Sequence, residues 1–363
     1  MQSKNILEIC LADGLGGLEL FTSTCYEYFK RKTNCKIIVD PRFKLSDYIN
    51  SDNPDLSYIV RNNKFAILPA FKLAKFIDEN DIDIIHIHWI KDMITVILAK
   101  LISKKRPNIV YSRHMNMTRF KDDIYHKWLY RQISLIHTVS EQVKEQAIKF
   151  IPSDVRPKVE AIHLGIDEPT IDTNRVEELK NKYKLEDSFV VGIVGRIESE
   201  KGQYIVIEAL DKLKELNIKL IIVGHTMDEN YLTELKQKIK NLDLEDKVIF
   251  TGFTREVNEH LKLLDTMILA TKKETFGLVV IESMINNTPV IATNAGGPLE
   301  IIDNMQDGLF FDRSVEDLVS KIKLLYDDEN LRKSLCNGGY QKIKKKFDSK
   351  IQMGKLYNYI NQA

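Results

Sequence analysis

The 363-residue chain has few cysteines, few glycines and prolines, and almost no net charge. Its four cysteines form no CxxC pair and are too sparse for a disulfide scaffold, so we expect free thiols in a reducing compartment. The 53 basic and 52 acidic residues leave a formal charge of +1, which argues against a dedicated nucleic-acid-binding protein. With only 16 glycines and 9 prolines, the composition is that of a globular protein rather than a disordered one.

Long hydrophobic runs are also missing. The best apolar run, residues 93–99, is seven residues long, whereas a membrane-spanning helix needs about 18. Glu8 and Asp13 fall where a secretory signal would have its apolar core. We therefore expect a cytoplasmic protein that does not cross a membrane.

Short β-branched segments alternate with amphipathic helical segments along the whole chain, which predicts parallel sheets with crossover helices. The clearest of these segments are residues 5–10, 35–40, 83–88, 108–113, 189–195, 219–224, 247–252, 266–271 and 289–293. The length predicts two domains at about 150 residues per domain. The periodicity lapses near residues 165–174, so we expect the first domain at 1–170 and the second at 171–340.

The segment KETFGLVVIESM, residues 273–284, carries the most specific pattern. A helix beginning near Phe276 would direct free backbone N–H groups and its positive dipole end at a phosphate, and Gly277 would allow close approach. Glu274 and Glu282 could then accept hydrogen bonds from hydroxyls on either side of that phosphate, as on a sugar and a ribose. A solvated helix with two unrelated glutamates explains the spacing equally well.

The segment GRIESEKG, residues 195–202, directly follows a predicted strand. Loops at the carboxyl ends of parallel strands line ligand crevices, and this loop carries Arg196 and Lys201. At ~4 Å from a diphosphate charge and an effective dielectric of ~20, each cation could contribute about 4 kcal/mol of attraction. The two cations would then take the place of a metal ion. In the alternative, Glu198 and Glu200 pair with both cations and the loop is an ordinary charged surface.

A glycine-rich turn, GLGGLE at residues 14–19, follows the first predicted strand. Such a turn lets the backbone approach a ligand closely. The third glycine of a dinucleotide-binding fingerprint would fall at Glu19, so the turn does not predict NAD binding. The segment NAGGPLE, residues 294–300, is a second glycine-containing turn between a predicted strand and a predicted helix.

The histidines have both structural and functional interpretations. His86 and His88 alternate on one predicted strand and share a sheet face, and the sequence places no further close ligand beside them, so we expect no metal site. His114 follows the strand 108–113 and, with Arg119, could face a cleft. The aromatic and basic residues of 120–134 suit either a plain domain helix or a helix that contacts a membrane or acceptor.

Together these motifs resemble the family 4 glycosyltransferases (glycosyl transferases group 1), retaining enzymes of the GT-B architecture with two facing, Rossmann-like, doubly wound α/β domains. The resemblance spans nearly the whole chain and also includes HTVSEQVK, HLGID, LIIVG, VIFTG and DGLFF. It implies that residues 341–363 form a helix that packs back toward the first domain. The loop after LIIVG lacks the glycine that relatives often carry near the nucleotide, so the resemblance leaves the nucleotide base of the donor open.

The resemblance also implies roles for individual residues. Arg196 and Lys201 would hold the donor diphosphate, and Glu274 would contact the transferred sugar. Glu282 would bind the ribose. The remaining donor and acceptor contacts would come from the backbone of Phe276, Gly277 and Leu278, from Gly16 and Gly17 near the reaction centre, and from His114 and Arg119 facing the acceptor or sugar.

We therefore expect a metal-independent, retaining hexosyltransferase without a bound cofactor. Its donor would be a UDP-sugar, with GDP- and ADP-sugars as the other candidates. Its acceptor would be a hydroxyl of a glycan or lipid-linked molecule in cell-envelope polysaccharide or glycolipid synthesis, at the inner face of the cytoplasmic membrane. The alternatives are a sugar-nucleotide epimerase of the same architecture and a noncatalytic sugar-nucleotide-binding subunit.

Overall fold

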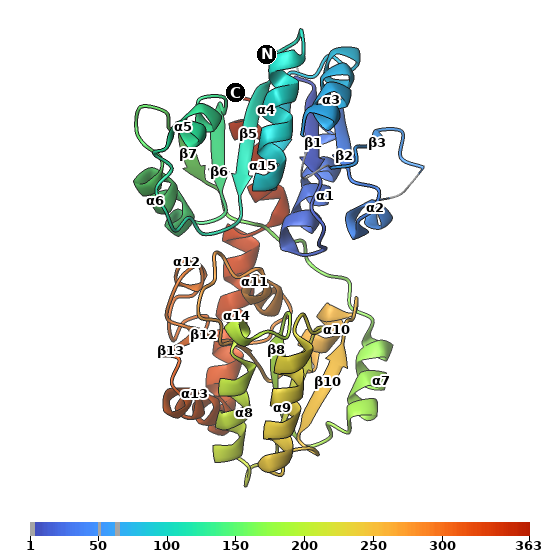
Figure 1. Ribbon diagram of the computed structural model, residues 1–363. Helices are drawn as coiled ribbons and strands as arrows, with labels where there is room; N and C mark the ends of the chain where they lie inside the picture. The colour runs from blue at the N-terminus through green and yellow to red at the C-terminus, as the bar shows by residue number, and fades with distance from the viewer. Residues whose placement is uncertain (1–3, 50–51, 62–65) are drawn as a thin grey trace. The chain divides into compact units, whose positions relative to one another are not determined.

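The computed structural model describes residues 4–49, 52–61 and 66–363, which form two compact α/β units (Figure 1). The first unit comprises Met1–Leu164 and Lys350–Ala363, and the second comprises Gly165–Ser349. Both boundaries differ from the predicted ones. The first falls at Leu164 rather than at residue 170 because Ile166 is tied into the second unit, where its N–H donates to the Phe347 carbonyl at 2.9 Å. The second falls at Ser349 rather than at residue 340.

The first unit is built on a seven-stranded parallel sheet in the order β3-β2-β1-β4-β5-β6-β7. Its strands are β1 (Ile6–Cys10), β2 (Cys35–Val39), β3 (Leu56–Tyr58), β4 (Ile84–Ile87), β5 (Asn108–Arg113), β6 (Leu135–Thr138) and β7 (Lys158–Ala161). The order reverses between β1 and β4, which is where doubly wound sheets place their ligand crevices.

Helices cover this sheet as the alternating pattern predicted. They are α1 (Gly17–Phe29), α2 (Lys44–Tyr48), α3 (Ile67–Glu79), α4 (Met93–Ile102), α5 (Ile124–Tyr130), α6 (Glu141–Phe150) and α15 (Ser349–Ile360), with a 3-10 turn η1 (Ile90–Asp92). The last helix, α15, joins the first unit (Figure 1): Tyr359 Oη donates to the Ile136 and Lys158 carbonyls at 3.2 and 3.0 Å. Phe29 of α1 packs against Tyr357 with ring centroids 5.5 Å apart.

The second unit repeats the topology with six parallel strands in the order β10-β9-β8-β11-β12-β13. These strands are β8 (Phe189–Val194), β9 (Ile218–Val223), β10 (Val248–Gly252), β11 (Thr266–Leu269), β12 (Val290–Thr293) and β13 (Leu309–Phe311). The helices are α7 (Thr173–Tyr183), α8 (Gln203–Lys212), α9 (Glu229–Asn241), α10 (Val257–Lys262), α11 (Leu278–Ile285), α12 (Pro298–Ile301), α13 (Val315–Asp327) and α14 (Glu329–Lys346), with a 3-10 turn η2 (Ser199–Lys201). The reversal now lies between β8 and β11.

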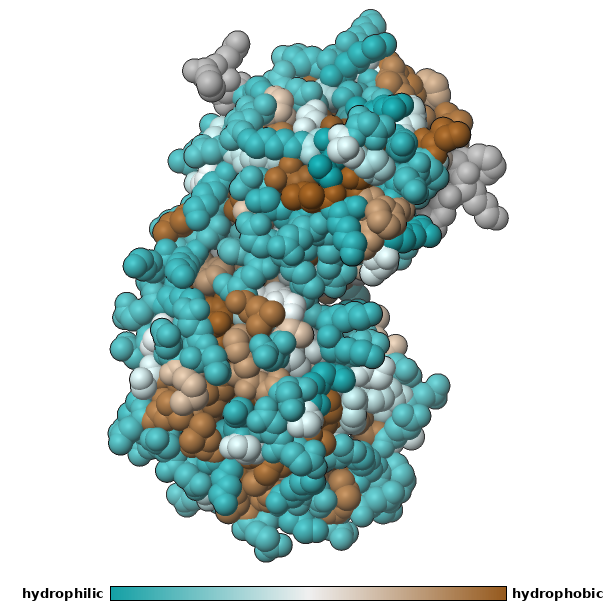
Figure 2. Space-filling view, turned by 90° about the vertical axis from the view of Figure 1, so that its left-hand side faces the viewer, coloured by the Kyte–Doolittle hydropathy of each residue, from teal (hydrophilic) through white to brown (hydrophobic). Residues whose placement is uncertain are grey.

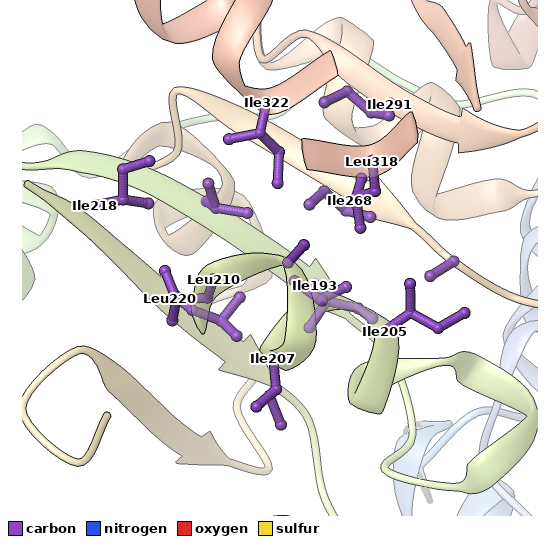
Figure 3. Close-up of a cluster of buried hydrophobic side chains, with 14 of the residues drawn as sticks. Ile193, Ile205, Ile207, Leu210, Ile218, Leu220, Ile268, Ile291, Leu318 and Ile322 are labelled. Atoms are coloured by element: carbon purple, nitrogen blue, oxygen red, sulfur yellow. The ribbon is translucent and has the colours of Figure 1, made fainter. Parts of the chain in front are cut away.

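A continuous apolar core joins α8 and α13 to one face of this sheet (Figure 3). Ile193 of β8 and Ile268 of β11 contribute from the strands, while Ile205 and Leu318 contribute from the two helices. All four side chains are buried, because strands covered on both faces and helices with one apolar stripe exclude water from this layer. The rigid layer positions the loops that leave the carboxyl ends of β8 and β11.

Candidate active site

Two loops at the reversal point of the second unit bring predicted donor-site residues together. Lys201, at the end of η2, follows β8, and Glu274 follows the adjacent strand β11. Lys201 Nζ lies 3.2 Å from Glu274 Oε2, and the two side chains are 24% and 17% exposed. This contact joins residues 73 positions apart in the sequence, so the loops present a fixed cation beside a carboxylate that can accept hydrogen bonds from hydroxyls.

Arg196 occupies the same loop but has a different partner. Its guanidinium Nη2 lies 3.0 Å from Glu198 Oε1, and its side chain remains 54% exposed. The alternative in which nearby glutamates pair with the loop cations therefore applies to Arg196, whereas Lys201 pairs with Glu274. The Gln203 amide anchors the loop by donating to the Arg196 carbonyl at 2.9 Å.

The helix expected near Phe276 begins two residues later, at Leu278. Gly277 precedes it with a φ of +101°, a left-handed conformation that favours glycine and lies outside the helical region, so the expected start is corrected. Phe276 is buried, and a Cβ added to Gly297 would lie 2.3 Å from the Phe276 Cα. The two glycine-containing loops therefore pack backbone against backbone, and the first N–H groups of α11 lie beside the Glu274 loop.

Glu282 lies within α11 and is partly buried. Its carboxylate makes no hydrogen bond or ion pair with any residue that the structure describes. Burial raises the pKa of Glu282 from its ordinary value of 4.5 to about 7. A carboxylate held without a protein partner is available to accept hydrogen bonds from a ligand.

This raised pKa predicts a pH-dependent effect of Glu282→Gln on stability. An acid whose pKa is higher in the folded state stabilises the protein below pH 4.5, and that contribution disappears as the pH rises through 7. At pH 8 the glutamine variant should therefore exceed the wild type in free energy of unfolding by ~1–3 kcal/mol, with no gain at pH 4.5. Urea denaturation at both pH values measures this, with exposed Glu245→Gln as the control. An equal gain at both pH values would contradict the explanation by ionisation.

The glycine-rich turn of the first unit ends at the start of α1. Gly16 is the N-cap, and its N–H donates to Glu19 Oε2 at 2.9 Å. Glu19, which occupies the place of the third fingerprint glycine, thus caps the start of α1 by accepting a hydrogen bond from the Gly16 N–H. A Cβ added to Gly17 would meet nothing within 4 Å, so its backbone faces open space.

A buried hydrogen-bonded network occupies the sheet face beneath α1. Glu8 Oε1 lies 3.0 Å from His86 Nδ1, and Glu8 Oε2 lies 2.6 Å from His88 Nε2. The Ser112 hydroxyl lies 2.6 Å from both His86 Nε2 and His137 Nδ1. Burial lowers the pKa values of His86 and His137 to about 3 and that of His88 to about 4, so all three imidazoles are neutral at pH 7.

This network corrects one expectation. The structure places Glu8 of β1 and Cys25 of α1 beside the His86 and His88 pair, so that four ligand-type atoms lie within 4.8 Å of one another. The premise that no further ligand lies near the pair is therefore wrong, because the sheet register pairs Glu8 with His86 directly. The Glu8 carboxyl group is within hydrogen-bond distance of both rings, whereas His88 Nδ1 is buried without a hydrogen-bond partner in the described chain.

His114 and Arg119 line one cavity of about 540 Å³ in the first unit. The His114 ring packs on Phe21 with centroids 5.1 Å apart, and burial, together with neighbouring histidines, holds its pKa well below 6.5. Its Nε2 is buried without a hydrogen-bond partner in the described chain. The same cavity is lined by Arg61, Trp89 and Arg113, which the sequence analysis did not single out, and by Lys121 of the aromatic and basic segment 120–134. The available indication was that Arg61 and Trp89 follow β3 and β4 and that Arg113 is the last residue of β5.

Comparisons with known proteins give consistent matches. The model for glycosyl transferases group 1 matches residues 175–342, and the model for glycosyltransferase family 4 matches residues 30–168. A capsular polysaccharide biosynthesis glycosyltransferase, CapM, of Staphylococcus aureus is 29% identical over 53% of this chain and 50% of its own length. N-acetyl-alpha-D-glucosaminyl L-malate synthase of Bacillus anthracis is 27% identical over 74% of this chain and 72% of its own length. The aligned parts therefore span one half to about three quarters of these relatives.

Solved structures share the fold. Anabaena Alr3699/HepE, crystallised in complex with UDP, superposes with a TM-score of 0.87 and 20% identity over 99% of this chain and 100% of its own. Two parallel-sheet α/β units of the GT-B architecture, as expected from the sequence, are thus confirmed as the fold of this chain.

Proposed function

Because the chain belongs to the family 4 (group 1) glycosyltransferases, we propose that it transfers a hexose-type sugar from a nucleotide-diphosphate sugar to an acceptor hydroxyl with retention at the anomeric carbon. The acceptor is a glycan or a lipid-linked molecule of polysaccharide or glycolipid synthesis. The observation that carries this proposal is the Lys201–Glu274 pair beside the start of α11.

In this proposal the second unit recognises the donor. Lys201 and Arg196 neutralise the diphosphate, assisted by the backbone of Phe276, Gly277 and Leu278 at the start of α11. Glu274 accepts hydrogen bonds from the transferred sugar, and Glu282 from the ribose hydroxyls. UDP is the favoured nucleotide, because the Anabaena protein of similar fold is described in complex with UDP and, in a further structure, with UDP-glucose.

The chemical step is a substitution at the anomeric carbon. The acceptor oxygen forms its bond on the face from which the diphosphate departs, the bond from that carbon to the diphosphate oxygen breaks, and the leaving phosphate takes the acceptor proton. Negative charge grows on the diphosphate as it leaves, so fixed cations and helix N–H groups lower the barrier. In the proposal they take the place of a metal ion.

The first unit recognises the acceptor in this proposal. Neutral His114 offers an unpartnered Nε2 to an acceptor or sugar hydroxyl, and Arg119 lines the same cavity. Gly16 and Gly17 contribute backbone at the start of α1.

Contact with the inner membrane surface is a further part of the proposal. Phe120, Ile124 and Tyr125 are 57%, 89% and 52% exposed, and Lys127 lies on the same helix as Ile124 and Tyr125. On the face shown in Figure 2, hydrophobic side chains form separate brown patches within a mainly teal surface. None of the helices in the described ranges combines the length and apolar character that a bilayer span requires.

A donor screen tests the proposal. UDP-, GDP- and ADP-sugars are incubated with the full chain and a panel of glycan and lipid-linked acceptors, with and without EDTA, and nucleotide release and product are measured. We expect acceptor-dependent release of UDP that EDTA does not reduce, and an α-linked product from an α-linked donor. A new sugar nucleotide formed without acceptor would indicate an epimerase instead, and donor binding without any turnover would indicate a noncatalytic subunit.

A further inference from the structure

The cavity of about 540 Å³ in the first unit has a strongly basic lining. It opens among residues that follow the carboxyl ends of β3, β4 and β5 and residues of α5. Its cationic residues are Arg61, Lys91, Arg113, Arg119 and Lys121. None of the lining residues in the part of the chain that the structure describes is acidic.

These cations lack acidic partners. None of the five forms an ion pair with a carboxylate among the residues described. Of the carboxyl groups nearby, Asp92 is buried, which raises its pKa to about 7, and the other two are engaged elsewhere. Asp40 binds the Arg42 guanidinium at 2.6 and 2.9 Å, and Asp123 lies 2.5 Å from His126 Nδ1. Burial, together with repulsion from neighbouring arginines, lowers the pKa of Lys121 below 10.5. An incoming anion would relieve this repulsion.

Two features show that the basic groups are held in place. Arg113 is only 7% exposed; its Nη2 donates to the Asn116 carbonyl at 2.8 Å, and its Nε is buried without a partner in the described chain. The Trp89 ring lies 4.2 Å from the Arg61 guanidinium carbon and 4.8 Å from Lys91 Nζ, so that it supports two cations at once. Ordered cations bind an anion without a further loss of side-chain entropy.

We infer that this cavity binds a phosphate or diphosphate group of the acceptor, an inference that rests on the proposed glycosyl transfer. A carboxylate would compensate one of the five charges, whereas a phosphate monoester carries about two and a diphosphate more. Arginine forks match phosphate oxygens in geometry. Leu18, Ile94 and Leu129 line the same cavity and leave an apolar surface for the remainder of the acceptor.

Calorimetry with the full chain saturated with UDP tests this inference, because UDP blocks the phosphate-binding loops of the second unit. The probes are inorganic pyrophosphate, farnesyl diphosphate and malonate. Both diphosphates should bind, and malonate should bind at least about 10-fold more weakly. Lys121→Gln and Arg119→Gln, which replace side chains that are not fully buried, should each weaken diphosphate binding by about 10-fold and leave UDP affinity unchanged. Lys127→Gln removes a cation of α5 that does not line the cavity and should change nothing.

Tighter binding of farnesyl diphosphate than of pyrophosphate would support the inference with a lipid-linked acceptor, and equal binding would support it with a soluble one. Absence of diphosphate binding to the UDP-saturated chain, equal binding of malonate, or an equal effect of Lys127→Gln would overturn it. Failure of UDP itself to bind would count against the proposed function, and diphosphate binding to the cavity could still be measured without UDP.

Discussion

Replacing Lys201 with alanine is expected to lower kcat by about 10- to 100-fold, with a smaller change in KM. Lys201 Nζ is held 3.2 Å from Glu274 and is largely buried, so a diphosphate beside it meets a fixed cation in a site with little water. A hydrogen bond to a charged group contributes about 1.5–3 kcal/mol, and each 1.36 kcal/mol is a factor of ten in rate. The loss falls mainly on kcat because charge on the leaving group grows in the transition state.

Arg196→Ala should lower kcat at least about 10-fold as well, although in the free protein its guanidinium is paired with Glu198. Lys212→Ala is the matched control, because it removes a lysine of the same unit whose partner, Glu316, lies 2.6 Å away in an exposed pair. Such a pair contributes little to stability and lies outside the proposed site. Steady-state kinetics with UDP-sugar measure all three variants. Full turnover by Lys201→Ala would remove the central element of the proposed mechanism.

Acidification is expected to destabilise the first unit steeply. His86, His88 and His137 have folded-state pKa values of about 3 to 4 against an ordinary 6.5, and the pKa of His114 is also held well below 6.5, so unfolding takes up about four protons as the pH falls below 6.5. Burial raises the pKa values of Glu8 and Asp92, which acts in the opposite sense and offsets about two of these protons. The stability supplied by the histidines is therefore present above pH 6.5 and is lost toward pH 4, at a net ~3 kcal/mol per pH unit.

Urea denaturation between pH 7.5 and 4.5 measures this slope. His137→Gln should reduce it by about one proton, because the variant removes one titrating ring from the network. His126→Gln, a partly exposed histidine of α5, serves as the control and should leave the slope unchanged. Stability that stays constant between pH 6.5 and 5 would show that the buried histidines do not control acid unfolding.

Most strands of both sheets could be predicted from the sequence, because segments buried on both faces of a parallel sheet must be apolar along their whole length. The three-residue edge strands β3 and β13 were not predicted. Residues 189–195 and 266–271 contain β8 and β11. The loops after them were predicted as a ligand site on the same grounds, since the carboxyl ends of neighbouring parallel strands share one edge. The contact between Lys201 and Glu274 was not foreseen, because a spacing of 73 residues carries no information about distance.

The basic cavity of the first unit escaped prediction for a related reason. Arg61 and Lys121 lie on different loops and Arg113 is the last residue of β5, and a single basic residue outside a helix is usually a solvated side chain. Likewise, the sequence around His86 and His88 did not indicate that Glu8 and Cys25 lie beside them, because those two residues belong to another strand and a helix. Only the sheet register, which sets Glu8 beside His86, reveals the network.

What the order of amino acids settled by itself was local: where strands and helices form, which glycine turns follow strands, and which family motifs the chain carries. These features depend on periodicity and on neighbours within a few residues. The three-dimensional fold decided which charges meet, which histidines stay neutral and which cations lack partners. Those properties depend on burial and on contacts between distant segments, which form only when each sheet folds with its helices.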